Sequence, residues 1–103
     1  MTRLRLSGKA REALRRIRLY SVERYGGRVA DAYLRGFSRA FDLLERHPRA
    51  GAIEPGFAGD IRSFVHRRHL IVYQLQGSDV LVIDIVHQAR DLDEALRESN
   101  EDK

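Results

Sequence analysis

The side chains best suited to chemistry in this 103-residue sequence are basic and imidazole groups concentrated in its second half. They are Arg62, His66, Arg67, Arg68, His69 and Arg90. The two-residue period of a strand places Arg62 and His66 on one side, whereas the position of Arg90 depends on a strand order that the sequence does not determine. Arginine binds phosphate and carboxylate through paired hydrogen bonds, so the cluster suggests an anion-binding surface. An ordinary charged sheet edge, which deters aggregation, is the alternative.

The histidines give little sign of metal or acid–base chemistry. His66 and His69 flank two arginines whose positive charge would repel a metal ion, and His47 is explained by its place at the end of a predicted helix. His87 ends a predicted strand, and as a general base it would need a nucleophile or a scissile phosphate nearby. The sequence contains no cysteine, which excludes thiolate nucleophiles and cysteine-ligated metals. We therefore expect no metal and no cofactor.

The net charge of +4 is distributed unevenly along the chain. Residues 1–50 hold thirteen Lys and Arg against five Asp and Glu, whereas residues 51–103 hold six against ten. All but two of the nineteen basic residues are arginine. The first half therefore favours an anionic partner, and the charge alone leaves both nucleic acid and an acidic protein open.

A strand and a helix are predicted at the beginning of the chain. Residues 2–6 alternate basic and apolar side chains, as in a short half-buried strand. Ser7 is a typical N-cap, and apolar residues then recur at steps of three and four over residues 8–25. The pair Gly26-Gly27 ends this helix, because glycine readily adopts the left-handed conformation of helix ends.

A second amphipathic helix follows the glycine pair. Its apolar stripe begins at Val29 and continues to Leu44 without a break. We expect it to end at His47, because Pro48 disfavours helical geometry in the residue before it. The two helices joined by a tight turn form a helical hairpin.

The remaining residues predict a loop and then a sheet. Residues 48–60 contain both prolines and three glycines and are expected to form a loop. Runs rich in Val, Ile, Leu and Tyr predict strands at residues 61–66, 69–76 and 80–87. The order is therefore β-α-α-β-β-β. This is an α+β fold, with a helical hairpin packed on a largely antiparallel four-stranded sheet.

Length and composition allow one small domain. We expect a single domain over residues 1–91 and an acidic tail over residues 92–103, with a short helix through Leu92, Ala95 and Leu96. No apolar run approaches the roughly 20 residues of a membrane helix, and the N-terminus lacks the apolar core of a signal peptide. We therefore expect a cytoplasmic protein that does not bind membranes.

The spacing of residues along most of the chain supports a family resemblance. The first half carries Ser7, Ala10, Leu14, Ile17, Tyr20, Gly26, Ala30, Tyr33, Phe37, Phe41, Leu44, Pro48 and Gly51. The second half carries Ile61-Arg62-Ser63-Phe64, His69-Leu70-Ile71-Val72-Tyr73 and Ile85-Val86-His87-Gln88-Ala89-Arg90-Asp91. In this order the residues resemble the ParE toxins of bacterial type II toxin–antitoxin systems, over about residues 4–91. The resemblance implies the β-α-α-β-β-β fold of the RelE/ParE superfamily.

The resemblance implies a toxin that inhibits DNA gyrase by protein–protein contact, arrests growth and is neutralised by a ParD-like antitoxin. The RelE branch of the superfamily instead cleaves messenger RNA on the ribosome, using basic residues of the sheet and a C-terminal arginine and tyrosine. Those basic positions fall on Ile61, Ser63 and Leu70 here, the arginine on Ala89 and the tyrosine near Ala95. None of these side chains carries a charge, so we expect a protein that is not an enzyme.

The family's antitoxins have a DNA-binding N-terminal domain and a C-terminal segment that folds along the toxin. We therefore expect a hetero-oligomer with an acidic antitoxin segment, with DNA reached only through the antitoxin. The predicted antitoxin contacts are Arg62, His66, Arg67, His69 and Tyr73, with Leu14, Ile17, Tyr20, Tyr33 and Phe37 as apolar groove residues. His87 and Arg90 are predicted target contacts. Two alternatives stay open: a ribosome-dependent nuclease with relocated groups, and a non-toxic antitoxin-binding module.

Overall fold

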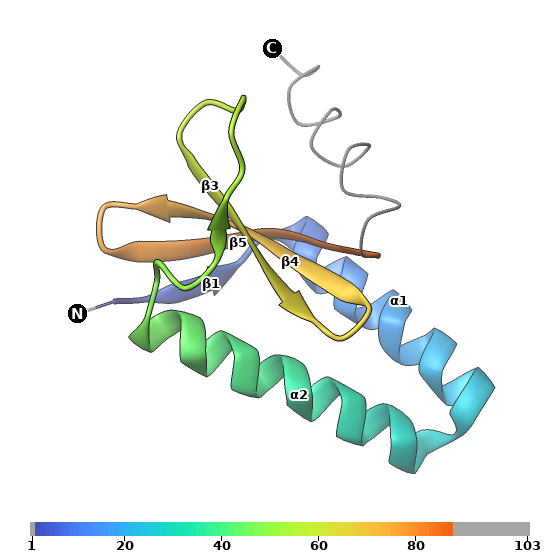
Figure 1. Cartoon of the computed structure of the whole chain (residues 1–103). Helices are drawn as coiled ribbons and strands as arrows, with labels where there is room; N and C mark the ends of the chain where they lie inside the picture. Colours follow the sequence, from blue (N-terminus) through green and yellow to red (C-terminus); the bar gives the residue numbers. More distant parts are fainter. Residues whose placement is uncertain (1, 88–103) are drawn as a thin grey trace.

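A short strand and two long helices precede the main sheet in the computed structural model, which describes residues 2–87. Strand β1 (Leu4–Leu6) leads into helix α1 (Gly8–Tyr25) and helix α2 (Gly27–Arg46). The strands that follow are β2 (Ala52–Ile53), β3 (Asp60–His66), β4 (His69–Gln76) and β5 (Asp79–His87). Both helices lie on the same side of the sheet (Figure 1), and we call the face that they cover the inner face.

The five strands form one mixed sheet in the order β1-β5-β4-β3-β2. Neighbouring strands from β2 to β5 are antiparallel, whereas β1 pairs in parallel with β5, with Leu4 opposite Val80. Val72 pairs with Asp84 but Tyr73 pairs with Val82, so β5 carries one extra residue at this point. Such a bulge bends a strand and strengthens its twist.

The predicted order of elements is confirmed, with one correction to the sheet. Helix 8–25 and strand 69–76 have the predicted bounds. The predicted four-stranded sheet has a fifth strand, β2, which lies in the segment 48–60 that we expected to be loop throughout. Two residues are too few to show a strand period. They are extended because they pair with Arg62 and Ser63, a contact that the local sequence does not reveal.

Capping groups set the ends of the two helices. The Ser7 Oγ atom accepts a hydrogen bond from the Ala10 N–H (3.0 Å) and donates one to the Ile83 carbonyl (2.6 Å), so the cap also ties α1 to strand β5. Gly26 has a φ of 87°, a value that side chains disfavour. Its N–H donates to the Val22 carbonyl of α1, and its carbonyl accepts from the Ala30 N–H of α2. One glycine therefore ends the first helix and begins the second.

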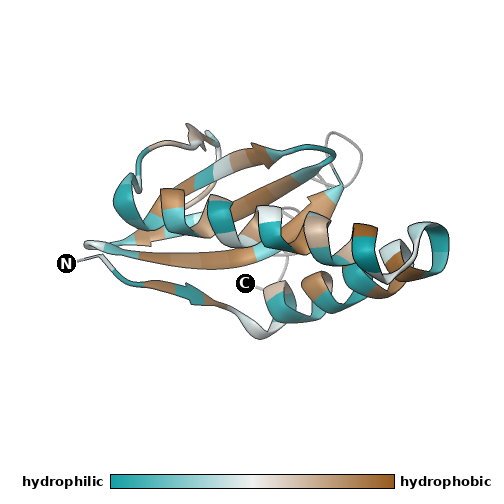
Figure 2. Ribbon diagram, turned by 90° about the horizontal axis from the view of Figure 1, so that it is seen from below, coloured by the Kyte–Doolittle hydropathy of each residue, from teal (hydrophilic) through white to brown (hydrophobic). Residues whose placement is uncertain are grey.

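The main core lies between the helices and the inner face of the sheet. Its buried members are Ala10, Ala13, Phe37, Ala40, Leu44, Ile71, Tyr73, Val80, Val82 and Ile85. Figure 2 shows apolar residues along the strands and hydrophilic residues interspersed along the outward sides of both helices. Burial of a side chain such as Phe37 contributes about 1.5–3 kcal/mol, so packing of α2 is a major source of stability.

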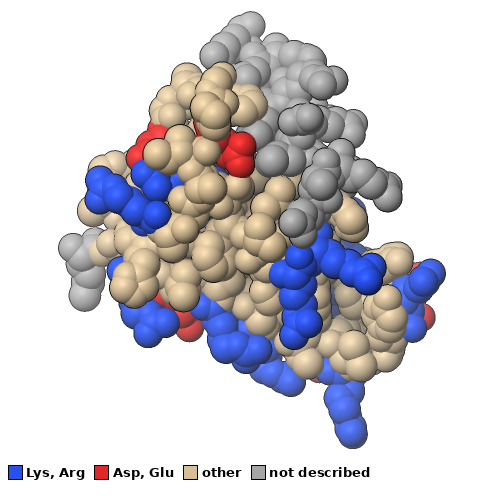
Figure 3. Space-filling view, viewed as in Figure 1, with Lys and Arg blue, Asp and Glu red and all other residues tan. Residues whose placement is uncertain are grey.

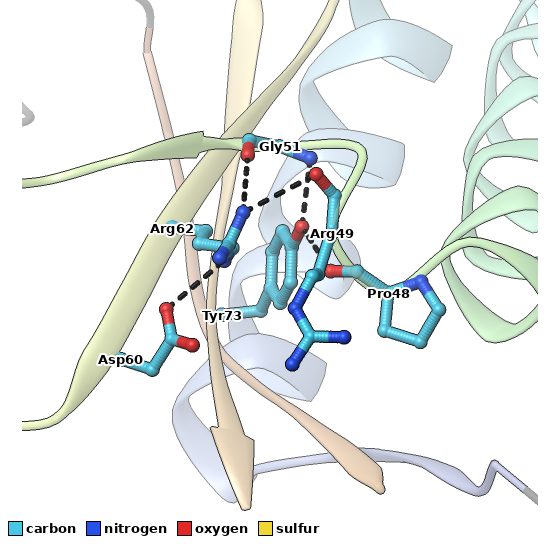
Figure 4. Close-up of polar contacts among 6 residues, drawn as sticks. All are labelled: Pro48, Arg49, Gly51, Asp60, Arg62 and Tyr73. Carbon is cyan, nitrogen blue, oxygen red and sulfur yellow. Dashed lines mark hydrogen bonds and ion pairs between the residues drawn. The ribbon is translucent and has the colours of Figure 1, made fainter.

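The Tyr73 hydroxyl fixes the connection from α2 to the sheet (Figure 4). It accepts a hydrogen bond from the Gly51 N–H (2.8 Å) and donates one to the Pro48 carbonyl (2.7 Å). A Cβ atom at Gly51 would lie 2.6 Å from this hydroxyl and 2.8 Å from the Ser63 carbonyl, so the chain passes where a side chain does not fit. Burial raises the pKa of Tyr73 and keeps its hydroxyl protonated.

The Arg62 guanidinium group binds the same connection from the other side (Figure 4). Its Nη1 atom donates to the carbonyls of Arg49 and Gly51, both at 3.2 Å, and its Nε atom donates to Asp60 Oδ1 at 2.9 Å. Arg62 is only 8% exposed. We expected Arg62 and Tyr73 to contact a partner; the structure instead places both inside the body of the protein, where they hold residues 48–51 against the sheet.

We predict that Tyr73→Phe destabilises the protein by about 1–3 kcal/mol, because it leaves the buried Gly51 N–H and the Pro48 carbonyl without a partner. Urea denaturation of the two proteins measures the difference. Tyr25→Phe is the matched control, since Tyr25 is exposed at the end of α1 and its change should stay within about 0.5 kcal/mol. Equal effects of the two substitutions would contradict the role given to the Tyr73 hydroxyl.

Candidate partner-binding cleft

A cleft of about 680 Å³ lies where the helix hairpin meets the ends of three strands. We call it the hairpin cleft. Its lining residues are Arg16, Ile17, Tyr20, Ser21, Tyr25, Val29, Tyr33, Arg67, Arg68, His69 and His87. None of these eleven lining residues is acidic. Arginine and tyrosine together give the cleft a positive charge and broad ring surfaces, which suit an anionic segment that also carries apolar side chains.

The basic rim of the cleft comes mainly from the turn between β3 and β4. His66 pairs with His69 across this hairpin, and Arg67 and Arg68 are its two loop residues. Arg67 has a φ of 55° and, within residues 2–87, is the one non-glycine residue with a positive φ. Glycine is usual at such a turn position. An arginine there is strained, and strain retained in this way is characteristic of positions that serve function.

The floor of the cleft is an aromatic cluster that joins α2 to the sheet. Tyr33 Oη lies 2.7 Å from His69 Nδ1, a hydrogen-bonding distance. The His69 ring also contacts the Phe37 ring edge-on at 5.8 Å and the His87 ring at 5.9 Å between centroids. Burial raises the pKa of Tyr33, although the charges of Arg67 and Arg68 oppose this. Tyr33 and His69 are therefore fixed in place before any partner binds.

His66 supports this cluster from behind. The centre of its ring lies 4.5 Å from that of Phe37, with the two planes tilted by 60°. The ring is also so close to α2 that a Cβ atom at Gly36 would come within 2.6 Å of its Cε1 atom. Gly36 therefore allows the helix to approach the strand. Among the described residues, the buried His66 Nε2 atom has no hydrogen-bond partner. Burial lowers the pKa of His66, and the neighbouring Arg67 charge lowers it further.

The cleft brings together seven of the residues singled out from the sequence. They are Ile17, Tyr20, Tyr33, Arg67, Arg68, His69 and His87. Arg62, Tyr73 and Phe37 are buried in the body of the protein, and Leu14 packs against its core. His66 lies beneath the cleft and does not line it. The predicted target contact Arg90 falls outside the described residues.

Four lining residues were not singled out from the sequence: Arg16, Ser21, Tyr25 and Val29. Tyr25 and Val29 flank the glycine turn, and both are more than half exposed. The sequence did contain a signal for Tyr25 and Val29. The end of a helical hairpin buries little of its own surface, so large apolar side chains on both sides of its turn indicate exposed residues that a partner can contact. Arg16 gave no such signal, since it is one of many arginines on α1.

The structure shows no sign of a metal centre or a membrane helix in the part of the chain that it describes. Within residues 2–87, no three His, Asp or Glu side chains are grouped so that they could hold a metal ion. Neither α1 nor α2 is apolar enough to cross a membrane. The chemistry available in the cleft is therefore that of arginine, tyrosine and imidazole side chains.

Comparison with known proteins gives a consistent result. A family model described as the ParE toxin of the type II toxin–antitoxin system parDE matches residues 4–92. Toxin ParE1 of Caulobacter vibrioides is 28% identical over 85 residues, which cover 82% of this chain and 88% of that toxin.

Solved structures share the fold. A chain of the chromosomal ParDE toxin–antitoxin system of P. aeruginosa aligns with a TM-score of 0.73 and 20% identity. A chain of the RelBE2 toxin–antitoxin complex of Mycobacterium tuberculosis aligns with a TM-score of 0.59 and 19% identity. Each alignment covers 84% of this chain and 96% of the other. The α+β fold of the RelE/ParE type is thereby confirmed.

We predict that His66 makes the protein less stable in mild acid. The pKa of His66 is lowered in the folded state, so the unfolded chain, with a histidine pKa of about 6.5, binds the proton more tightly. The contribution of neutral His66 to the free energy of unfolding is therefore fully present above the unfolded-state pKa. It is lost as the pH falls through that value towards the folded-state pKa. Urea denaturation across this range should give a smaller pH dependence for His66→Gln than for the wild type.

His47→Gln is the control for this measurement, because His47 is an exposed residue that caps the end of α2. It should retain the pH dependence of the wild type. An unchanged slope in His66→Gln would show that other groups cause the loss of stability.

Proposed function

This chain belongs to the ParE toxin family of type II toxin–antitoxin systems, and from this premise we propose that it inhibits DNA gyrase by direct contact and is neutralised by a ParD-like antitoxin. An acidic segment of the antitoxin binds in the hairpin cleft. The observation that carries this proposal is the composition of the cleft, which combines three arginines and three tyrosines with no acidic residue in its lining.

The cleft offers two kinds of contact to such a segment. Arg16, Arg67 and Arg68 provide guanidinium groups that bind carboxylates through paired hydrogen bonds. Tyr20 and Tyr25 provide exposed rings that gain contact area at little cost in side-chain entropy. An amphipathic acidic helix or an extended acidic segment with apolar anchors fits both kinds of contact.

Parts of the cleft are held ready for binding. The guanidinium group of Arg24 lies 5.6 Å from the centre of the Tyr20 ring, a cation–π contact that orients this exposed tyrosine. Tyr33 is held by His69 on the floor. Fixed side chains lose less entropy when a partner binds, which favours high affinity. Figure 3 shows that further basic side chains gather over the helical side of the molecule, where they attract an acidic partner.

Inhibition by contact, without catalysis, is supported by the positions that carry charge in the nuclease branch. Ile61 and Leu70 are apolar and lie together in a buried cluster on the side of the sheet away from the helices. The Ser63 hydroxyl donates a hydrogen bond to Glu54 at 2.6 Å. None of the three carries a positive charge, and the Ser63 hydroxyl is engaged with a carboxylate, so the positive groups of the nuclease branch are missing at these positions. DNA is reached through the antitoxin, with which the toxin forms a hetero-oligomer.

We predict that the purified protein inhibits supercoiling by DNA gyrase in a dose-dependent manner and that added antitoxin restores supercoiling. An assay of relaxed plasmid with purified gyrase measures both effects. Normal supercoiling at a molar excess of toxin would rule out gyrase as the target.

Two further measurements separate the alternatives. Primer extension on translated messages would detect cleavage by a nuclease, and His87→Ala would then abolish it. Unaffected growth after induction without antitoxin would indicate a module that only binds the antitoxin.

We predict that Arg67→Gly weakens antitoxin binding about tenfold, or about 1.4 kcal/mol, because it removes a rim guanidinium. The same substitution should not lower the free energy of unfolding, and can raise it by up to about 1 kcal/mol, since glycine relieves the positive φ. Isothermal titration and urea denaturation measure the two effects.

Arg11→Ala is the matched control, because Arg11 is exposed on α1 and does not line the cleft. Its antitoxin affinity should remain that of the wild type. Equal losses of affinity in Arg67→Gly and Arg11→Ala would mean that general charge, and not the cleft, binds the antitoxin.

A further inference from the structure

Exposed apolar side chains in this protein are concentrated at one place, the end of the helix hairpin. Within residues 2–87, seven large apolar residues are exposed, and five of them belong to the last two turns of α1 or the first turn of α2. These five are Leu19, Tyr20, Val22, Tyr25 and Val29. Single exposed apolar residues are ordinary on a protein surface, whereas a group of them is typical of a contact site.

The hairpin cleft accounts for only part of this group. Three of the five residues line the cleft, but Leu19 and Val22 do not. Two residues along an α-helix correspond to a rotation of about 200°. Leu19 is two residues from Ile17 and two from Ser21, which both line the cleft, so its side chain lies on the opposite side of α1.

Arginines continue this side of α1 towards its N-terminus. Arg15 precedes Leu19 by four residues and Arg11 precedes it by eight, steps that return to nearly the same side of a helix. Both arginines are exposed. Val22 lies one turn beyond Leu19, so the two apolar side chains are neighbours. We call the row formed by Arg11, Arg15, Leu19 and Val22 the outward face of α1.

The structure of the helix itself does not explain the two apolar residues. Leu19 is 59% exposed and Val22 is 37% exposed, and neither packs against the main core. Valine is also a poorer helix former than alanine, lysine or glutamate, so an exposed valine in α1 does not serve helix formation.

The charge of α1 indicates what kind of partner fits this face. The helix holds six Lys and Arg against two Glu, whereas α2 holds four Arg against three Asp and Glu. Glu12 is shared between Arg15 at 3.1 Å and Arg16 at 4.0 Å. Exposed ion pairs of this kind are weak and exchange readily for other carboxylates. The outward face is therefore complementary to a surface that carries acidic side chains around an apolar hollow.

Other occupants satisfy only one of the two features. A nucleic acid offers phosphates to Arg11 and Arg15 but gives Leu19 and Val22 little to pack against. A second copy of the chain would bring two strongly positive helices together, and like charges repel. An acidic protein surface accommodates both the arginines and the apolar pair.

We propose that the outward face of α1 is the surface by which the toxin contacts its protein target, with Leu19 and Val22 in an apolar hollow and Arg11 and Arg15 on carboxylates around it. The inference rests on the function proposed above, since it requires a protein target distinct from the antitoxin. The antitoxin segment binds the cleft on one side of α1 and the target binds the other side. The two partners therefore contact different residues and respond to different substitutions.

Leu19→Glu tests this face, because it replaces an exposed apolar anchor with a charge that an acidic target repels. We expect the toxin concentration for half-inhibition of supercoiling by purified gyrase to rise about tenfold or more. Growth after induction without antitoxin should recover. Isothermal titration should give the antitoxin affinity of the wild type, and urea denaturation should give its stability, since Leu19 makes no core contact.

Ile53→Glu is the matched control. Ile53 is another exposed apolar residue, on the edge strand β2, and it receives the same charge. This variant should remain as toxic as the wild type. Equal losses of toxicity in Ile53→Glu and Leu19→Glu would mean that added negative charge, and not the outward face, is responsible, and would overturn the proposal.

Leu19→Lys separates the apolar contact from the charge. It also removes the anchor, but its positive charge is attracted by an acidic target, so it should retain more activity than Leu19→Glu. Equal losses in the two variants would overturn the acidic character of the target surface. Full activity of Leu19→Lys would show that charge alone binds, as for a nucleic acid, and would overturn the proposal as well.

The remaining outcomes distinguish this inference from the proposed function. Wild-type toxicity of Leu19→Glu, or a joint loss of its antitoxin affinity, would overturn the inference alone. Growth arrest by the wild type without inhibition of gyrase would reject gyrase, and the growth of cells that produce Leu19→Glu would then decide the role of the face. Absence of growth arrest by the wild type would overturn both.

Discussion

The position of helix α2 on the sheet is the constraint on which the rest of the structure depends. The helix is fixed at its C-terminal end by the hydroxyl of Tyr73, which binds the backbone on both sides of residue 50. It is fixed again at Gly36, where the absence of a side chain lets it approach His66. These two points set the direction of the helix. The hairpin end then projects past the turn between β3 and β4 (Figure 1). The hairpin cleft is lined by residues of both.

The local parts of this structure were predictable from sequence. Ser7, Gly26 and Pro48 are signals that act within a few residues, and the helix bounds follow from them closely. The two-residue strand β2 carried no such signal, because its extended form depends on a partner strand. The same limit applies to the site. Strand alternation correctly grouped Arg62 with His66, but it did not show that residues 48–51 would cover Arg62 and leave Arg67 exposed.

Arginine therefore has two distinct roles in this protein. The buried Arg62 guanidinium donates to three oxygen atoms of the protein instead of to water: Asp60 Oδ1 and the carbonyls of Arg49 and Gly51. Removing any one of these acceptors would leave a buried charge poorly paired. Arg67 remains in solvent and occupies a backbone conformation that glycine would adopt with less strain. The presence of an arginine at position 62 is explained by its contribution to stability. The presence of one at position 67 is not. Counting basic residues along a sequence cannot make this distinction, whereas the acceptors around each guanidinium group make it directly.

The parallel pairing of β1 with β5 also has a consequence for the synthesis of the protein. Leu4 lies beside Val80, so the first and last described strands must meet before the sheet is complete. Pairing residues so distant in sequence carries a large loop-closure entropy and slows folding, and during translation β5 leaves the ribosome after the other four described strands. The N-cap of α1 also depends on β5, because the Ser7 hydroxyl donates a hydrogen bond to the Ile83 carbonyl of that strand. The nascent chain thus cannot complete its native sheet until β5 has left the ribosome, and the appearance of the folded domain is delayed to that point.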